Sequence, residues 1–218
     1  MTEKMPSPAD GQELGPKERI FHAAVRLFSR KGFAATGMRE LAKEAEVNLA
    51  MINYFYESKH GLLEAIVDDF FQGLLEVMHQ NLFGDDPPEV RLERHIKAAG
   101  RYLCSKSQQA VLIASQLPLD DPKTTSFKAD RVRMLLKTAS EAVLGELEQK
   151  LGTRFPPNIL GPAMIAAMLS HFMAKPVIEQ LGLGEFDEEF YATYPDIIAE
   201  VALYGALNLG KKHPVEDK

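Results

Sequence analysis

One stretch decides the fold of this chain: residues 19–66, RIFHAAVRLFSRKGFAATGMRELAKEAEVNLAMINYFYESKHGLLEAI. From Ile20 to Phe28 its apolar residues recur three and four positions apart with arginines between them, which is the period of an amphipathic helix. Gly32 ends the run, because glycine commonly stops a helix. The pattern therefore predicts a first, basic helix that begins near Lys17.

Two short helices follow within the same stretch. The pattern predicts them at residues 38–45 and 49–56, separated only by a few residues, with Ile52 and Tyr56 of the later helix facing inward. Two short helices joined by a tight turn after a basic helix are typical of a helix-turn-helix, whose second helix lies in the DNA major groove. Short helix pairs are also common in other all-α proteins, so this pattern alone leaves the function open.

The chain continues as a series of helices. Ser58 can cap a fourth helix, whose apolar residues form two adjoining stripes. These are Leu62, Ile66, Phe70, Leu74 and Met78, with Leu63, Val67, Phe71 and Leu75 beside them. So broad an apolar surface predicts a connector helix that packs on both the amino-terminal unit and a larger carboxy-terminal one. Further helical patterns lie at 88–106, 108–117, 123–151, 157–181 and 188–209. We find no sustained alternation of period two, so the predicted fold is all-α.

The composition favours an ordinary globular protein. With 218 residues and 45% hydrophobic content, the chain can bury a substantial core, and its single Cys104 cannot form an internal disulfide. Residues 1–16 are rich in proline, glycine and charge, which predicts a flexible leader without the apolar run of a signal peptide. No run of about 18 uncharged apolar residues suggests a membrane span. We expect a soluble, cytoplasmic protein with no membrane partner.

The charge is unevenly distributed along the chain. The formal net charge is −6, yet residues 17–60 hold eight lysines or arginines against five acidic residues. Residues 61–218 hold 16 basic residues against 23 acidic ones. A basic block on an acidic body indicates that the two parts meet different partners, with the basic block suited to nucleic acid.

The deciding stretch closely resembles the amino-terminal domain of the tetracycline-repressor (TetR) family of bacterial transcriptional regulators. The resemblance lies in AAVRLFSRKGFAAT (23–36), MRELAKEA (38–45), VN (47–48) and SKHGLL (58–63). It implies a helix-turn-helix DNA-binding domain over 17–78, with the motif at about 37–56. It also implies an effector-binding and dimerisation domain over 79–210, followed by a tail at 211–218. The implied function is a ligand-responsive repressor that binds a palindromic double-stranded operator as a homodimer, with activation as an open alternative.

The resemblance also implies which residues contact DNA: Thr36, Arg39, Asn48, Leu49, Ala50, Asn53, Tyr54, Ser58 and Lys59. Asn53 suits an adenine edge, because its amide both donates and accepts hydrogen bonds. The Tyr54 hydroxyl suits a phosphate or sugar. Ser58 and Lys59 stand at a helix start, where free backbone amides and the helix dipole favour a phosphate. Plainer interpretations stay open: a helix cap for Asn48, a partly buried ring for Tyr54 and a solvated charge for Lys59.

Three positions depart from the usual pattern of the family. Glu46 stands where a glycine usually makes the turn, so the backbone there needs a different conformation or carries strain. Gly37 stands where a serine or threonine often caps the second helix, although Glu40 keeps the other half of a capping box. Phe55 stands where a polar ring often lies, which weakens the case for a phosphate contact there.

The carboxy-terminal part offers candidates for a ligand pocket and for a dimer contact. Met78, Phe127, Met134, Met164, Met168, Met173 and Phe172 are candidates to line a cavity for a small, largely apolar effector, with plain core packing as the alternative. A small-residue stripe, Ala163, Ala167, Ser170 and Ala174, and an apolar face, Ile197, Val201, Tyr204 and Leu207, suit a helix-helix dimer contact.

No pattern indicates an enzyme. His95 and His171 lack partners at ligand spacing, so we expect no metal and no cofactor. No P-loop, nucleophile elbow, zinc-protease or paired-cysteine motif occurs. Two alternatives to a regulator stay open: a helical small-molecule carrier or enzyme, and a protein–protein adaptor that does not bind DNA.

Overall fold

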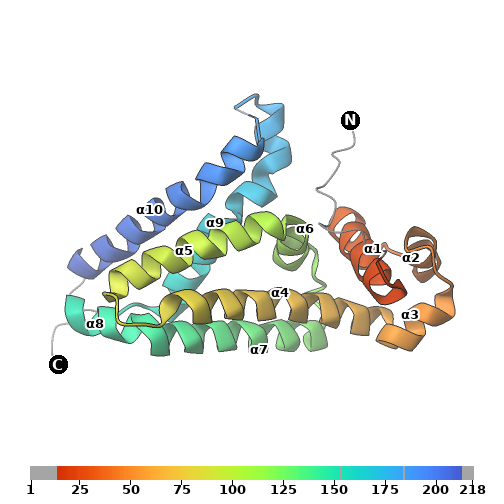
Figure 1. Ribbon diagram of the computed structural model, residues 1–218, viewed down its shortest axis with the longest axis horizontal. Coiled ribbons are helices and arrows are strands. Elements are labelled where there is room, and N and C mark those ends of the chain that lie inside the picture. Colours follow the sequence, from red (N-terminus) through yellow and green to blue (C-terminus); the bar gives the residue numbers. More distant parts are fainter. Residues whose placement is uncertain (1–13, 153, 184, 213–218) are drawn as a thin grey trace.

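The computed structural model describes residues 14–152, 154–183 and 185–212, and these ranges contain helices and no strand (Figure 1). The all-α prediction is confirmed. The expected leader and tail lie mostly outside the described residues, which exclude 1–13 and 213–218. Across the described ranges, none of the helices combines the length and apolar character needed to cross a membrane.

Three helices form a unit at one end of the molecule, at the right of Figure 1. They are α1 (Pro16–Lys31), α2 (Met38–Glu44) and α3 (Leu49–Tyr56), and the long α4 (Lys59–Leu82) leads from them into the rest of the chain. Gly32 has a φ of +85°, and its amide donates to the Phe28 carbonyl, which closes the last turn of α1. The predicted limits of these helices agree with the observed ones to within a residue or two.

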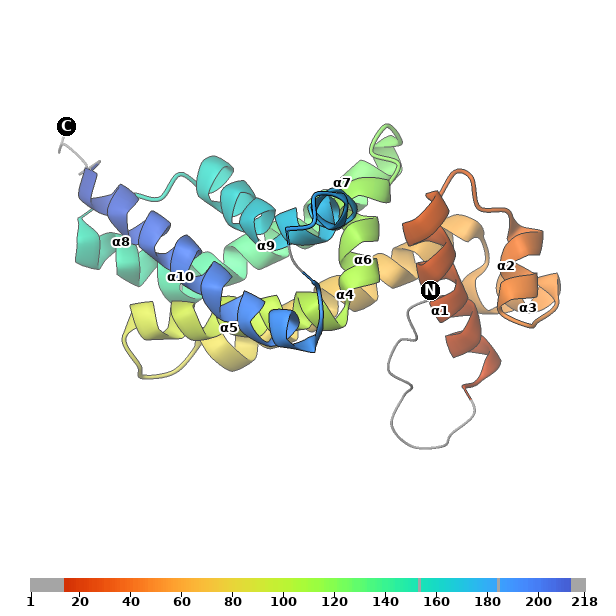
Figure 2. The ribbon, with the colours of Figure 1, turned by 90° about the horizontal axis from the view of Figure 1, so that it is seen from above.

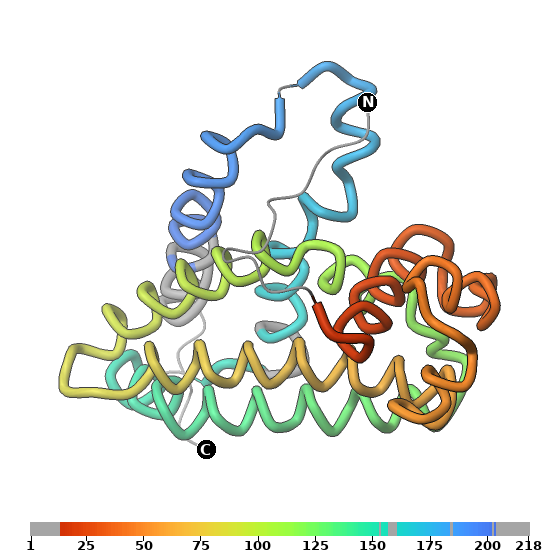
Figure 3. Tube along the Cα trace, turned by 45° about the vertical axis from the view of Figure 1, so that its right-hand side comes forward, coloured from red at the N-terminus to blue at the C-terminus, as the bar shows by residue number. Residues whose placement is uncertain are grey.

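The remaining helices stack on α4. In Figure 1, α7 (Pro122–Ala139), α4, α5 (Pro88–Ser105) and α10 (Glu188–Lys212) lie above one another in that order, and α9 (Pro157–Gln180) passes behind them. Figure 3 shows the same order from another side. Figure 2 shows α8 (Gly145–Leu151) at the opposite end of the molecule from α1–α3.

Glycine permits the close approach of α5 and α10. A Cβ atom added at Gly100 would lie 2.9 Å from the Cβ of Pro195, which is closer than real side chains approach one another. Replacing Gly100 with a larger residue would therefore push the two helices apart.

The amino-terminal unit and the rest of the chain share one core. Leu27 and Phe28 of α1 belong to the same buried cluster as Phe70 of α4, Leu112, and Phe172 of α9. Burial on this scale stabilises the join between the two parts, because each large apolar side chain contributes about 1.5–3 kcal/mol. The prediction that α4 connects the two parts and packs on both is confirmed.

Two helical runs contain π-helical segments that the sequence did not indicate. The predicted run 108–117 is α6 (Ser107–Val111) followed by η1 (Leu112–Gln116), and the run 123–151 contains η2 (Ser140–Leu144) between α7 and α8. At η2 the guanidinium of buried Arg91 donates to the Ala142 carbonyl at 2.7 Å and to the Leu82 carbonyl at 2.8 Å. The Ala142 carbonyl thus has a partner outside its own helix, as is common where the regular helical bonding is interrupted.

Candidate nucleic-acid interface

The turn between α2 and α3 holds the two helices in a fixed relation. Leu41 and Ala45 are buried, and the Val47 amide donates to the Ala42 carbonyl at 3.0 Å. Glu46 has a φ of +53°, in the left-handed region. A side chain there costs about 1–2 kcal/mol relative to ordinary backbone. The expectation that Glu46 requires an unusual backbone conformation is confirmed.

α3 is anchored on its inner side. Ile52 is fully buried, and the hydroxyl of buried Tyr56 donates to the Lys17 carbonyl at 3.0 Å. Burial raises the pKa of Tyr56 to about 12, so this hydroxyl keeps its proton at ordinary pH. Asn48 caps the helix by accepting a hydrogen bond from the Met51 amide at 3.0 Å. The cap interpretation of Asn48 is confirmed, and it leaves the side-chain nitrogen free to donate elsewhere.

The outer side of α3 carries four exposed residues. They are Leu49, Ala50, Asn53 and Tyr54. Because residues four apart in a helix are neighbours on its surface, Leu49 lies beside Asn53 and Ala50 beside Tyr54. Tyr54 is 81% exposed, so its interpretation as a partly buried ring is wrong. The predicted DNA-facing residues of α3 therefore form one continuous surface that points away from the core.

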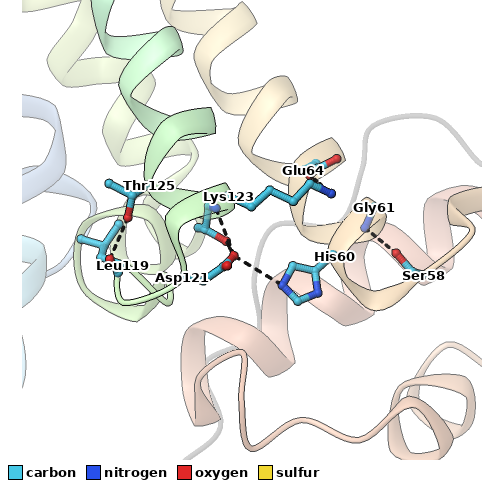
Figure 4. A network of polar contacts seen from close by, with 9 residues as sticks. Ser58, His60, Gly61, Glu64, Leu119, Asp121, Lys123 and Thr125 are labelled. Carbon is cyan, nitrogen blue, oxygen red and sulfur yellow. Dashed lines mark hydrogen bonds and ion pairs between the residues drawn. The ribbon is translucent and has the colours of Figure 1, made fainter.

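The start of α4 lies beside this surface. The Ser58 hydroxyl accepts a hydrogen bond from the Gly61 amide at 3.0 Å, which confirms the predicted cap (Figure 4). The Lys59 ammonium lies 4.4 Å from the centre of the Phe33 ring and 3.4 Å from the Ala34 carbonyl. Partial burial lowers the pKa of Lys59. Its interpretation as a fully solvated charge is wrong, because the ammonium lies against the loop that precedes α2.

Thr36 is placed differently from the expectation. Its side chain is only 3% exposed, and its hydroxyl donates to the Gly32 carbonyl at 3.0 Å. A buried hydroxyl whose proton already has a partner cannot readily donate to a phosphate, so the structure argues against the expected contact. Arg39, by contrast, is exposed on α2 and has no ion-pair partner among the residues that the structure describes.

Ion pairs tie α1 to α2. Arg26 pairs with Glu44 at 3.2 Å, and Lys31 pairs with Glu40. Lys31 lowers the pKa of Glu40 by a side-chain hydrogen bond, and a weaker backbone hydrogen bond from Gly37 acts in the same direction. Part of the positive charge of residues 17–60 is therefore neutralised within the motif.

The sequence did not predict the ion pairs between α4 and α7. His60 lies 3.8 Å from the Asp121 carboxylate, Lys123 pairs with Glu64 at 3.1 Å (Figure 4), and Arg131 with Asp68 at 2.6 Å. An aspartate directly before a proline at a helix start is a recognisable cap signal, so the role of Asp121 as a cap was predictable. Its pairing with His60 was not, because no local pattern joins two segments so distant in the chain.

The residues expected to line a ligand pocket do not converge on one cavity. Phe127, Met168 and Phe172 belong to or pack against the large shared cluster, Met78 lies in a second cluster, and Met164 packs against a third. Met134 and Met173 are 47% and 53% exposed. Phe127 alone among them lines the cavity beside His60 and Lys128, whose volume is about 10 Å³. This placement favours the alternative of plain core packing for most of the set.

The two long carboxy-terminal helices carry an exposed apolar surface. Its members are Met173 and Val177 on α9, Leu181 directly after α9, and Ile197 and Val201 on α10. Exposed apolar residues gathered in this way are typical of protein contact surfaces. The side chains of Tyr204 and Leu207, which were expected to extend the face on α10, lie outside the described residues. Within the described ranges, no group of three or more His, Cys, Asp or Glu side chains is arranged to hold a metal ion.

Comparison with known proteins relates the helix-turn-helix region to one family. Residues 20–66 match the profile described as "Bacterial regulatory proteins, tetR family". The chain is 44% identical over 84 residues to the probable HTH-type transcriptional regulator YttP of Bacillus subtilis, covering 37% of this chain and 41% of YttP. The match thus spans about two fifths of the length of that relative and centres on the motif described above.

Solved structures share the fold over nearly the whole chain. A bacterial regulatory protein of the tetR family from Rhodococcus RHA1 superposes with a TM-score of 0.68 at 21% identity, covering 94% of this chain and all of that one. FadR from Bacillus subtilis, solved in complex with stearoyl-CoA, has a TM-score of 0.68 at 14% identity and covers 86% of this chain and 98% of its own. The helices after α4 therefore follow an architecture that these two solved proteins share.

Proposed function

Because residues 20–66 match the tetR family of bacterial regulatory proteins, we propose that the chain is a transcriptional regulator of this family that places α3 in the major groove of an operator. The observation that carries this proposal is the surface of Leu49, Ala50, Asn53 and Tyr54, which is exposed while Ile52 anchors the same helix in the core. Repression is the proposed action, because a protein bound over a promoter blocks access of the polymerase.

In this proposal, different residues recognise the bases and contact the phosphate backbone. Asn53 contacts a base edge, since its side chain is exposed near the middle of the outer surface. Tyr54 and the amides at the start of α4 contact the phosphate backbone, which orients the protein on the duplex. Lys59 joins them by leaving the Phe33 ring and turning its ammonium toward phosphate. Arg39 on α2 supplies a further cation.

The apolar surface on α9 and α10 supports a homodimer. A pair of such helices from each of two copies would form a four-helix contact, and the small residues Ala167 and Ala174 would let the helices approach closely. A two-fold dimer presents two copies of α3 and therefore suits a palindromic operator whose half-sites lie about one helical turn apart. Sedimentation at micromolar concentration tests this part, and a strictly monomeric particle would contradict it.

A small, largely apolar effector is proposed to act on the body that follows α4. Drug-sized ligands occupy pockets of about 300–1,000 Å³, whereas the cavity beside Phe127 measures about 10 Å³. An effector that entered at this cavity would have to move helices apart, and a ligand that binds only the opened form shifts the equilibrium between the two forms. The FadR neighbour solved with stearoyl-CoA supports an acyl chain as one kind of ligand to try.

The experiment that tests the DNA-binding proposal uses duplexes selected from a random pool by the full chain. Fluorescence anisotropy then compares the wild type with Asn53→Ala on the selected site and on unrelated DNA. We expect a loss of about tenfold or more per half-site on the selected duplex, because one good base contact contributes about 1–3 kcal/mol, and little loss on unrelated DNA. Asn81→Ala is the matched control, because it removes the same amide at the far end of α4.

Two outcomes would contradict the proposal. Equal weakening of selected and unrelated DNA by Asn53→Ala would remove the reading role from this residue. A protein that bound no duplex in a salt-sensitive way would instead favour the carrier, enzyme or adaptor alternatives, because contacts with phosphates always make binding depend on salt.

A further inference from the structure

The outer surface of α3 contains no charged side chain. The helix runs LAMINYFY over Leu49–Tyr56, and its exposed members are two apolar residues, one amide and one phenol. Leu49 is 39% exposed although it is a large apolar side chain. A solvent-facing surface of a short helix ordinarily carries charges, so this composition requires a chemical explanation.

The composition restricts which bases the helix can recognise. Guanine is most often read by the paired donors of arginine or lysine, and α3 has neither residue. An asparagine amide matches the donor and acceptor of adenine, and apolar side chains contact the 5-methyl group of thymine. Asn53 offers the first kind of contact, and Leu49 and Ala50 offer the second.

The cations on neighbouring elements do not supply the missing charge. Lys31 and Arg26 are paired with the carboxylates of Glu40 and Glu44. Lys59 lies over the Phe33 ring. Arg39 and Lys43 are exposed but stand on α2, the helix that crosses the DNA backbone in this motif. Their geometry suits phosphates, so the base-reading surface stays uncharged.

We infer that α3 reads A·T base pairs, with Asn53 on an adenine and Leu49 and Ala50 on the methyl groups of adjacent thymines. This inference rests on the proposed function and adds the class of base pair that the half-site contains. Leu49 and Asn53 are neighbours on the surface of the helix, so one contacted adenine and one contacted thymine fall on the same or adjacent base pairs. In the complex, thymine methyl groups then cover the apolar side chains of Leu49 and Ala50. This contact accounts for apolar side chains on the solvent-facing side of α3 in the free protein.

The experiment uses the full chain and its selected duplex, in which single bases of each half-site are replaced. Deoxyuridine in place of thymine removes only the methyl group, and 7-deaza-adenine in place of adenine removes only the N7 acceptor. We expect deoxyuridine to weaken binding about fourfold at each contacted thymine, from the loss of one buried methyl group. We expect 7-deaza-adenine to weaken binding about tenfold at the contacted adenine.

Variants assign each effect to a side chain. Leu49→Ala should bind the thymine and deoxyuridine duplexes with nearly equal affinity, because the contact that senses the methyl group is gone. Asn53→Ala should become indifferent to 7-deaza-adenine while it still distinguishes thymine from deoxyuridine. Both side chains are exposed, so circular dichroism should show the wild-type helix content and thermal midpoint for both variants.

The other possible outcomes distinguish a failure of the A·T inference from a failure of the proposed DNA-binding function. Selected half-sites with G·C pairs at the contacted positions, or full binding to deoxyuridine and 7-deaza-adenine duplexes, would overturn the A·T inference while leaving DNA binding intact. If both variants still responded to the base replacements as the wild type does, the assignment to Leu49 and Asn53 would be overturned. Absence of any salt-sensitive duplex binding would overturn both the inference and the function on which it rests.

Discussion

His60 in the first turn of α4 lies 3.8 Å from the carboxylate of Asp121, the residue that caps α7 (Figure 4). The same turn of α4 holds Lys59 and the free backbone amides that we propose to contact phosphates. A displacement of the α7 start would therefore reach, through this contact, the part of α4 that we propose to meet DNA. This contact is a short physical route from the helical body to the DNA-binding end, through two side chains and no intervening loop.

Replacing Asp121 with alanine should destabilise the protein at neutral pH. The carboxylate accepts hydrogen bonds from the Thr124 amide at 3.0 Å and from its hydroxyl at 2.7 Å, and the variant loses both together with the His60 contact. Asp120→Ala is the control, because it removes an adjacent exposed charge that does not cap the helix. Urea denaturation measures the difference, and equal midpoints for the two variants would contradict the capping role.

The effect of Asp121 should depend on pH. The Thr124 hydrogen bonds lower the pKa of Asp121 below its ordinary value of 3.8. A carboxyl group with a lowered pKa stabilises the folded state above its unfolded-state pKa, and this contribution disappears as the pH falls through the folded-state value. The stability of the wild type and of Asp121→Ala should therefore differ at pH 7 and converge in strong acid.

Replacing Arg91 with methionine should be the most damaging change outside the apolar core. Its guanidinium is buried and donates to the carbonyls of Leu82, Asp86 and Ala142, and also pairs with Glu146. Because these carbonyls would lose a buried partner, we expect a loss of about 3 kcal/mol or more in the free energy of unfolding.

The control for this prediction is Arg94→Met. Arg94 stands one turn further along α5, where it pairs with Asp86 and donates to the Asn81 carbonyl. Both contacts are partly exposed, so the loss should be smaller than for Arg91, at about 1 kcal/mol. Denaturation in urea compares the two variants. Similar losses for both would show that the buried carbonyl contacts of Arg91 contribute little.

His95 should make the protein sensitive to mild acid. Burial lowers the pKa of His95 from 6.5 to about 4. The unfolded chain takes up a proton below pH 6.5 and the folded chain does not until about pH 4, so stability falls across this interval as the pH is lowered. The loss should reach about 3 kcal/mol.

A variant without the titrating group tests this source of acid sensitivity. His95→Gln should lose less stability than the wild type between pH 7 and pH 4.5, whereas His79→Gln, on an exposed position of α4, should behave as the wild type. Thermal unfolding at both pH values gives the comparison. An unchanged pH dependence in His95→Gln would assign the sensitivity to other groups, such as His22 and His171, whose pKa values burial also lowers.

Lys59→Met should flatten the salt dependence of DNA binding. The variant keeps most of the apolar stem that packs near Phe33 and removes the charge. We expect weaker binding to all duplexes and a salt slope lower by about one unit per subunit, since each neutralised phosphate contributes about 0.9 to that slope. Lys123→Met, which removes a cation from the nearby start of α7, should leave the slope unchanged. An intact slope in Lys59→Met would exclude the proposed phosphate contact.

The sequence by itself determined the helices of the amino-terminal unit and where they begin and end. Gly32 ends α1, Asn48 caps α3 and Ser58 caps α4 where the pattern placed them, because these signals act within one turn of the chain. It also separated the inner side of α3 from the outer, since Ile52 and Tyr56 follow the helical period. The unusual backbone at Glu46 was expected from the resemblance to the TetR family, in which a glycine usually makes this turn.

Only the tertiary structure decided which polar groups are available for binding. Thr36 and Tyr54 both carry hydroxyl groups in the motif, yet packing buries the first at 3% exposure and leaves the second 81% exposed. Packing likewise places Lys59 over Phe33 and separates Met78 from Phe172. These outcomes depend on contacts between segments far apart in the chain, and such contacts form only when whole helices dock, so no local pattern of residues encodes them.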